Sequence, residues 1–457
     1  MPVSDRYSRL FQSVLFPLWE TAVRGRNTPT LIAQLERTQW RSRDEIEALR
    51  VGALRRLLDH AYRNVPFYRS RFDALSMTPG DIRSIADLAQ LPVLTRDQGI
   101  ESYTARRSLR GPRPTISKST GGTTGQPMRF GYDAGSEDFR QAVKLRGWGW
   151  AGYRMGAPTL YYWLLPRAPS RAQQLKMRVD RALKRETYID CTHRSIADMD
   201  AVVASIRKTR PETIVTFSQA IADLARHINQ GGLRTWETIP VLCSAERLSP
   251  ADRAEVAEAF GPAVYETYGC REMMLIAAEC EAHAGMHSSA ENIIVEVIVT
   301  DLDGSQRAAD PGESGDVVLT DLHNFGMPFI RYAIGDRAIL AKEGMCSCGR
   351  SLPRIASIEG RVAETLRDGA GANVSGLLFN VLLTPYASQV RQFQAVQHKH
   401  GGITLKLVEN QNLDEVTRAA IQLRSRDLVP GIDVQALIVD EIPLARSGKR
   451  QIVIVEK

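Results

Sequence analysis

Strand-like and helix-like segments alternate between about residues 155 and 275, and this alternation limits the fold more than any other feature. Runs rich in β-branched, aromatic and other apolar residues predict strands at 159–165, 213–217, 240–244 and 263–267. Between them lie apolar residues at helical spacing, such as Ile221, Leu224 and Ile228. This alternation predicts an α/β fold in which a parallel sheet is covered by helices. Ligands bind such sheets at the carboxyl ends of strands, so residues directly after predicted strands are the first candidates for a site.

The pattern differs on both sides of this region. Residues 1–105 are predicted to be largely helical, and residues 290–360 are predicted to be β-rich because Gly, Pro and Asp turns separate short strands there. After Arg361 the pattern is β–α–β. A chain of 457 residues is too long for one hydrophobic core. We therefore expect a large N-terminal domain over 1–361 and a small α+β domain over 362–457.

Charge and composition narrow the classes of partner. The formal net charge is +7, from 59 Lys and Arg against 52 Asp and Glu. A modest excess of positive charge suits anionic small molecules. A nucleic-acid-binding protein is expected to carry a basic stripe with interleaved aromatic residues, and the sequence has none. The expected partners are therefore small molecules rather than nucleic acid.

The N-terminal segment is apolar over residues 11–19 but short, and Pro17 interrupts it. Asp5 precedes it and no small-residue cleavage site follows, so a signal peptide is not expected. No apolar run approaches the ~18 residues of a membrane span. We expect a packed segment and a cytoplasmic protein; membrane contact is not expected, although weak contact stays an open alternative. Six cysteines in so long a chain do not form a disulfide scaffold.

A run of glycine and hydroxyl residues precedes the alternating region. Glycines let a loop point several backbone N–H groups at one anion, and hydroxyl groups add donors at the same place. That chemistry suits a triphosphate, although such a run is by itself most often a solvated turn. It is not a Walker A loop, because no Gly-Lys-Ser/Thr follows at the required spacing. The loop consists of Ser119, Thr120, Gly121, Gly122, Thr123, Thr124 and Gly125.

Four further motifs follow this loop in a fixed order, and together they carry a resemblance. They are Tyr268-Gly269-Cys270-Arg271-Glu272, Arg331-Tyr332-Ala333-Ile334-Gly335-Asp336, Gly360-Arg361, and Pro443-Leu444-Ala445-Arg446-Ser447-Gly448-Lys449. This ordered set of motifs spans residues 119–449 and resembles that of the adenylate-forming superfamily of acyl-CoA synthetases and adenylation domains. Within that superfamily it is most similar to the phenylacetate-CoA ligase group and its CapK-like branch.

The resemblance implies roles for individual residues. The loop 119–125 would hold the phosphates of ATP, Glu272 would hold Mg²⁺, and Asp336 would bind the ribose hydroxyls. Lys449 would place its ammonium group where negative charge develops on the forming acyl phosphate. The adenine would be bordered by Ser244, Ala245, Glu246, Tyr268 and Gly269, and Arg361 would belong to the hinge and nucleotide site.

Three positions depart from the family pattern. Arg271 stands where many relatives have Thr or Ser, and its guanidinium is expected to grip phosphate or to pair with Glu272. Gly121 replaces a hydroxyl residue, and Gln126 replaces a frequent Lys. Neither change removes the N–H donors of the loop, so the expectation of ATP binding is kept.

The implied reaction is the activation of a carboxylic acid by ATP to acyl-AMP, with release of pyrophosphate, and then acyl transfer to CoA. In the family the small domain is mobile and rotates between the two steps. Two rival enzymes share the first step: an amide synthetase, with an amine as acceptor, and an enzyme that acylates a carrier-protein thiol. A non-catalytic nucleotide- or acyl-binding protein is a rival of another class, and a homodimer is an open alternative to a monomer.

A second constellation combines three cysteines with a histidine: Cys280, His287, Cys346 and Cys348. Thiolates and one imidazole form a closed tetrahedral Zn²⁺ site when they converge. The spacing within each pair is unlike that of a zinc finger, and buried reduced cysteines are the alternative. Some relatives in the resembled group carry a similar set, so we expect a structural zinc site. His283 is a substitute for His287 as ligand.

Overall fold

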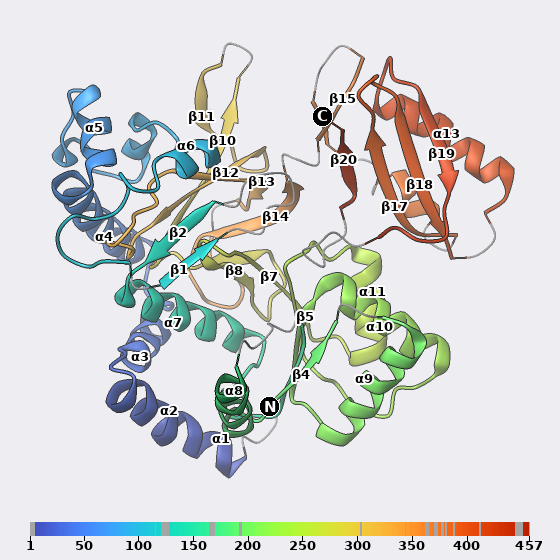
Figure 1. The fold of residues 1–457 in the computed structure, drawn as a ribbon, viewed down its shortest axis with the longest axis horizontal. Coiled ribbons are helices and arrows are strands. Elements are labelled where there is room, and N and C mark those ends of the chain that lie inside the picture. Colours follow the sequence, from blue (N-terminus) through green and yellow to red (C-terminus); the bar gives the residue numbers. More distant parts are fainter. Residues whose placement is uncertain are drawn as a thin grey trace. The chain divides into compact units, whose positions relative to one another are not determined.

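The computed structural model describes residues 5–114, 116–119, 128–163, 170–191, 194–301, 304–342, 344–361, 365–369, 373–375, 379, 382–386, 389–410, 413–443 and 451–456. These residues form two compact units. The first unit contains most of the chain up to Ser357, and the second contains Gly335–Ala338 together with the residues from Ile358 onward. Figure 1 shows the fold. The predicted domain boundary at 361/362 stays a prediction.

The first unit opens with helices. Four consecutive helical segments are followed by four helices and two short 3-10 turns: α1 (Arg6–Leu10), η1 (Phe11–Leu15), α2 (Phe16–Leu18), η2 (Trp19–Val23), α3 (Thr28–Thr38), α4 (Arg43–Asn64), α5 (Pro66–Ala74), η3 (Pro79–Asp81), η4 (Ala86–Gln90) and α6 (Arg96–Glu101). Ser42 and Glu45 form a capping box at the start of α4. One face of α4, with Leu54 and Leu57, packs with Ile294 of the β-rich region. This packing ties the helical region to the sheet.

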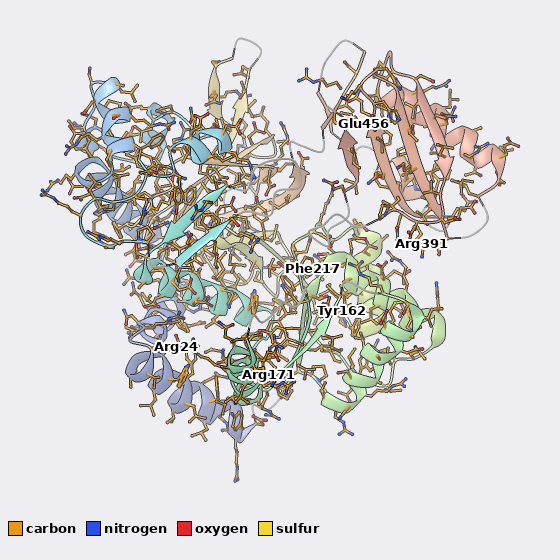
Figure 2. The ribbon with its side chains drawn as sticks, in the orientation of Figure 1. Arg24, Tyr162, Arg171, Phe217, Arg391 and Glu456 are labelled. Carbon is orange, nitrogen blue, oxygen red and sulfur yellow. The ribbon has the colours of Figure 1, made fainter. Side chains whose placement is uncertain are left out.

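One 12-stranded sheet runs through the alternating and β-rich regions, in the order β11-β10-β12-β13-β14-β9-β8-β7-β6-β5-β3-β4. Its parallel part consists of β3 (Thr159–Trp163), β4 (Glu186–Asp190), β5 (Thr213–Phe217), β6 (Val241–Ser244) and β7 (Val264–Cys270). The intervening helices are α8 (Arg171–Lys184), α9 (Ile196–Thr209), α10 (Ser218–Gly231) and α11 (Pro250–Phe260). Tyr162 and Phe217 belong to the core of this part (Figure 2). The predicted α/β fold class is confirmed.

The sequence patterns did not identify every element of this part. Strand β4 was missed because it is a short edge strand in which all five residues, including two acidic ones, are only partly buried. Helix α8 was missed as well, although Leu175, Val179 and Leu183 recur at helical spacing; none of its residues is buried, so this stripe does not face the core. Both elements lie at one end of the sheet, where burial is low.

The remaining strands of the large sheet are β8 (Met274–Glu279), β9 (Met286–Ser288), β10 (Ile293–Thr300), β11 (Gln306–Ala308), β12 (Ser314–Asp321), β13 (Tyr332–Leu340) and β14 (Arg354–Arg361). Antiparallel pairing begins between β7 and β8. A separate hairpin joins β1 (Ile116–Ser119) to β2 (Arg129–Tyr132), and α7 (Ala134–Trp150) follows it. Helix α7 packs against α3 and β8. The β7–β8 turn therefore marks the change from parallel to antiparallel pairing.

The second unit has its own sheet, in the order β19-β18-β17-β20. Its elements are β15 (Thr365–Arg367), β16 (Asn373–Ser375), η6 (Thr384–Tyr386), β17 (Val390–Gln397), β18 (Ile403–Glu409), α13 (Glu415–Leu428), β19 (Val434–Ile438) and β20 (Val453–Val455). Leu405, Leu407 and Ile421 belong to a separate core. No helix among the described residues of either unit is long and apolar enough to cross a membrane.

Candidate functional site

Glu272 lies in the turn that joins β7 to β8, and it is only 7% exposed. Its carboxylate Oε1 accepts a hydrogen bond of 3.2 Å from the phenol of Tyr332 on β13. Burial, and then the neighbouring carboxylate, raise the pKa of Tyr332, so the phenol keeps its proton and acts as the donor. No partner of Oε2 is found among the described residues, which leaves this oxygen for a cation.

The main chain of the same turn is held by Arg140 of α7. The Arg140 guanidinium donates hydrogen bonds to the carbonyl of Glu272 and to the carboxylate of Asp321. It also lies over the ring of Tyr132, 4.5 Å from the ring centroid. Arg140 and Asp321 are both fully buried, so each charge depends on the other. Sequence reasoning missed this pair because 181 residues separate its members and no spacing signal connects them.

Gly269 is required by the geometry of the β7–β8 turn. The strand register shifts between Tyr268 and Gly269, as in a β-bulge. A Cβ atom at position 269 would lie 2.0 Å from the carbonyl oxygen of Met274, which no side chain tolerates. Tyr268 itself is buried on the strand. The glycine of this motif therefore shapes the turn that carries Arg271 and Glu272.

Arg271 is exposed and forms no ion pair with Glu272 in the described part of the chain, so the expected alternative of an internal pair is not found. Lys118 of β1 lies close enough to be influenced by it. Burial, and then the nearby Arg140 and Arg271 charges, lower the pKa of Lys118, against the opposing effect of Glu137. The exposed Arg271 therefore adds positive charge at the Glu272 turn, whereas the charge of Arg140 is paired with Asp321.

Ser244 is the last residue of β6, and Ala245 and Glu246 follow it, at the position predicted for ligand binding. The hydroxyl of Ser218 donates to the carbonyl of Glu246 (2.7 Å), and its oxygen also lies 3.3 Å from the carbonyl oxygen of Ser244. The Glu246 carboxylate accepts a 3.2 Å hydrogen bond from the backbone N–H of Gln219. These bonds fix the segment to the start of α10, beside the carboxyl end of β5.

The other predicted site residues are placed only in part. Ser119 is exposed at the end of β1, Asp336 is partly buried on β13, and Arg361 is the last residue of β14. Two parts of the predicted site lie outside the described residues, and their roles stay predictions. They are Lys449 and the phosphate loop beyond Ser119, which consists of Thr120, Gly121, Gly122, Thr123, Thr124 and Gly125.

The three cysteines and the histidine converge. The ligand atoms of Cys280, His287, Cys346 and Cys348 all lie within 4.8 Å of one another. The Sγ atoms of Cys280 and Cys346 are 3.8 Å apart, and Nε2 of His287 is 3.3 Å from Sγ of Cys348. Nδ1 of His287 is 3.1 Å from the carbonyl oxygen of Leu352. That bond assigns the proton to Nδ1 and leaves Nε2 as the metal-facing atom.

Packing holds this cluster in place. The indole of Trp150 meets the His287 ring edge-on at 5.6 Å, and the guanidinium of Arg350 lies 5.0 Å from the Trp150 ring centroid. The side-chain oxygen of Gln39 accepts hydrogen bonds from both Trp150 (2.7 Å) and Arg350 (3.0 Å). Burial lowers the pKa of His287 to about 4 and raises that of the Cys280 thiol to about 12. A cation that binds Cys280 must therefore displace the proton of its thiol.

His283, the alternative ligand, lies outside the cluster. Its Nδ1 is 3.5 Å from the carboxylate of Glu279, and its ring stacks on Tyr265 with centroids 4.8 Å apart. The structure therefore favours His287 as the fourth ligand.

Comparisons with known proteins fit this arrangement. Residues 368–456 match the family model of the CapK C-terminal domain. The phenylacetate-coenzyme A ligase of Thermus thermophilus is 27% identical over 372 residues, which cover 79% of this chain and 80% of the relative. The enzyme of the same name from Escherichia coli is 27% identical over 345 residues, or 73% and 75% of the two chains.

Solved structures share the fold. The chain superimposes on 2-hydroxyisobutyryl-CoA ligase in its postadenylation state, in complex with R3-HIB-AMP, with a TM-score of 0.73 and 19% identity over 92% of each chain. ATP-bound MatB from Rhodopseudomonas palustris gives a TM-score of 0.54 at 14% identity, covering 75% of this chain and 67% of MatB.

Proposed function

We propose that this chain, a homologue of the phenylacetate-coenzyme A ligases with a CapK C-terminal domain, is an adenylate-forming ligase. It activates a carboxylic acid with ATP and transfers the acyl group to coenzyme A. The observation that carries the proposal is the position of Glu272, whose buried carboxylate is held by Tyr332 and whose main chain is held by Arg140. The 2-hydroxyisobutyryl-CoA ligase that shares the fold contains an acyl-AMP, which supports the same intermediate here.

The first step joins two anions. A carboxylate oxygen attacks the α-phosphorus of ATP, the bond to the β-phosphate oxygen breaks, and pyrophosphate leaves. Positioning and positive charge supply most of the catalysis in such a step. Mg²⁺, when bound, would neutralise phosphate charge, and Oε2 of Glu272 fits a hard cation that prefers carboxylate oxygen. Lys118 and Arg271 add positive charge near this turn.

Other residues complete the nucleotide site in this proposal. The loop of residues 119–125 holds the phosphates through N–H and hydroxyl donors. Asp336 accepts hydrogen bonds from the ribose hydroxyls. The segment 244–246 and Tyr268 border the adenine. Lys449 stabilises the charge that develops as the acyl phosphate forms.

The second step forms a thioester. The thiol sulfur of CoA attacks the acyl carbonyl, its proton is lost, and AMP leaves with the bonding electrons. Coenzyme A as acceptor is supported by the names of the relatives and by a 2-hydroxyisobutyryl-CoA ligase complex that contains CoA. An amine or a carrier-protein thiol would accept the same acyl group by the same substitution.

The cysteine–histidine cluster serves the fold rather than the chemistry in this proposal. Three cysteines and one histidine would supply four ligands to a Zn²⁺ ion, and such a closed set would leave no position for a substrate. Cys280 follows β8, whereas Cys346 and Cys348 precede β14. One ion would therefore connect segments 66 residues apart.

A pyrophosphate-release screen across aliphatic and aromatic carboxylic acids, with and without CoA or amines, tests the function. We expect acid-dependent release from ATP and CoA-dependent thioester formation. Glu272→Gln keeps the side-chain shape and removes the charge, so release should fall about a hundredfold or more. Glu258→Gln, an exposed change on α11, is the matched control and should have no effect. Release that is independent of any acid would reject the proposal.

A further inference from the structure

Exposed apolar side chains are concentrated in two helical segments of the first unit. Among the described residues, nineteen large apolar side chains are exposed, and nine of them lie within residues 10–23 and 175–183. Scattered exposed apolar residues are normal, but a concentration of this kind marks an interaction site. We call residues 5–26 and 170–185 together the basic apolar surface.

Each segment presents a stripe with helical spacing. Leu10, Val14 and Leu18 recur every four residues in the first segment, and their exposed fractions are 49%, 41% and 57%. Leu175, Val179 and Leu183 do the same on α8, with exposed fractions of 62%, 52% and 52%. Residues four apart lie on one helix face, so each helix has an uncovered apolar stripe.

The first segment is fixed to the body of the unit. Phe11 is buried and packs against Gly156, where an added Cβ would clash with its ring. Gln12 donates a 3.0 Å hydrogen bond to the carbonyl of Met155. The buried Glu20 accepts a 3.1 Å hydrogen bond from Arg24. The helix therefore keeps one face inward, and the uncovered stripe is a fixed feature of the fold.

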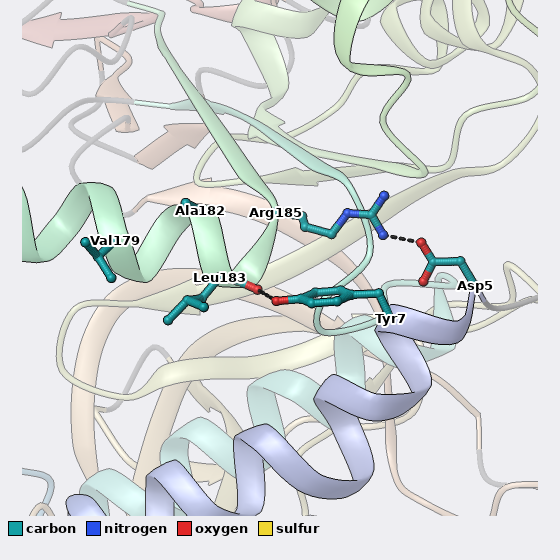
Figure 3. A pocket seen from close by; sticks show the side chains of 6 residues that line it. All are labelled: Asp5, Tyr7, Val179, Ala182, Leu183 and Arg185. Atoms are coloured by element: carbon teal, nitrogen blue, oxygen red, sulfur yellow. Dashed lines mark hydrogen bonds and ion pairs between the residues drawn. The ribbon is translucent and has the colours of Figure 1, made fainter.

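The two helices meet at one end. The hydroxyl of Tyr7 donates a 2.6 Å hydrogen bond to the carbonyl of Leu183, and Arg185 pairs with Asp5 (Figure 3). An open groove of about 610 Å³ lies between them, lined largely by apolar atoms of Tyr7, Val179 and Leu183. The two stripes thus belong to neighbouring helices.

The charge of this surface identifies the class of occupant. Residues 5–26 and 170–185 contain ten Lys and Arg against three Asp and Glu, which gives +7. The whole chain also has a net charge of +7, so the remaining residues are balanced. Arg171, Lys176 and Arg178 are exposed, and none forms an ion pair with a carboxylate in the described structure. Arg24 and Arg171 lie on the two segments in Figure 2.

We propose that the basic apolar surface binds the anionic face of a lipid bilayer, with both helices lying in the interface. Apolar stripes that enter the headgroup boundary, Lys and Arg beside them, and a Trp at the edge are the properties of interfacial helices. Trp19 is 42% exposed, and Arg24 lies over its ring. Binding of a second chain through this same surface is disfavoured, because the two positively charged surfaces would repel each other. The proposal is independent of the ligase activity, and it goes beyond the weak membrane contact that the sequence leaves open.

Vesicle flotation of the full chain tests the proposal. We expect binding to vesicles of phosphatidylcholine mixed with phosphatidylglycerol, weaker binding to phosphatidylcholine alone, and loss of binding as NaCl rises. Leu10→Gln/Leu18→Gln replaces two of the three stripe residues of the first segment, and Lys176→Glu/Arg178→Glu reverses two charges on α8. Each double variant should reduce partitioning about tenfold or more.

Matched controls make the same chemical changes elsewhere. Val416→Gln/Leu423→Gln alters two exposed apolar residues of α13, and Lys208→Glu/Lys399→Glu makes the same charge change. Both should bind like the unmodified chain, and thermal unfolding should be unchanged in all four. No binding to anionic vesicles, or equal losses in the controls, would overturn the proposal. Self-association without vesicle binding, abolished by Leu10→Gln/Leu18→Gln, would assign the surface to a second copy and also overturn it.

Discussion

The phenol of Tyr332 donates a 3.2 Å hydrogen bond to the Oε1 atom of Glu272, from a strand 60 residues further along the chain. The bond lies in a buried setting, where a hydrogen bond to a carboxylate is stronger than in water. It orients the carboxylate that we propose binds Mg²⁺. Tyr332 therefore acts as a positioning residue for Glu272.

Tyr332→Phe should weaken this arrangement without unfolding the protein. We expect the Mg²⁺ concentration for half-maximal pyrophosphate release to rise about tenfold, because one charge-assisted hydrogen bond is lost. Tyr162→Phe is the matched control, because the buried Tyr162 hydroxyl has no hydrogen-bond partner among the described residues. If pyrophosphate release depended on Mg²⁺ in the same way in Tyr332→Phe, Tyr332 would not position the carboxylate that binds Mg²⁺.

Arg140→Met should destabilise the first unit by about 3–5 kcal/mol, because it leaves the buried carboxylate of Asp321 unpaired. Arg140→Met/Asp321→Leu should recover most of that stability in denaturant unfolding. Pyrophosphate release should not recover in the double variant, since the Glu272 carbonyl still lacks its donor. If both stability and release recovered, Arg140 would have no positioning role.

Much of this arrangement follows from sequence pattern, and part of it does not. Four of the five parallel strands were predictable because buried strands and amphipathic helices leave strong periodic signals, and Gly269 was found within its motif. The Arg140–Asp321 pair was not, because a side-chain contact across 181 residues leaves no local signal. The N-terminal segment was expected to pack, yet only part of it does: Phe11 is buried while Leu18 is exposed. Residue spacing shows amphipathicity but not what covers each face.

We expect one Zn²⁺ per chain by elemental analysis. Cys280→Ser or chelation should lower the melting temperature by about 5 °C or more, because a structural site contributes its binding free energy to folding. Pyrophosphate release measured well below the melting temperature should change little. Metal-free protein after purification without chelators would reject the site, and loss of turnover before loss of stability would make the metal catalytic.

Lys144 should make stability depend on pH. Its ammonium lies 5.1 Å from the Trp148 ring centroid, and burial lowers the pKa of Lys144 to about 8, partly opposed by Glu186. Between about pH 8 and 10.5 the unfolded chain holds a proton that the folded chain has lost, so stability should rise with pH by about 1–3 kcal/mol. Lys144→Met should remove this rise and stabilise the protein at pH 7. If the stability of Lys144→Met depended on pH in the same way as that of the unmodified protein, the pH dependence would not come from Lys144.

Carboxylate-dependent exchange of labelled pyrophosphate into ATP tests the central claim most directly, because only reversible formation of an acyl-AMP produces it. We predict exchange with at least one carboxylic acid and no need for CoA. In Lys449→Ala the activation free energy of exchange should rise by about 2–4 kcal/mol, so the exchange should be much slower. Calorimetry should show a nearly unchanged affinity for ATP. Unimpaired exchange in Lys449→Ala would remove that lysine from the mechanism. An acid-dependent thioester synthesis that proceeds without any exchange would contradict the adenylate intermediate itself.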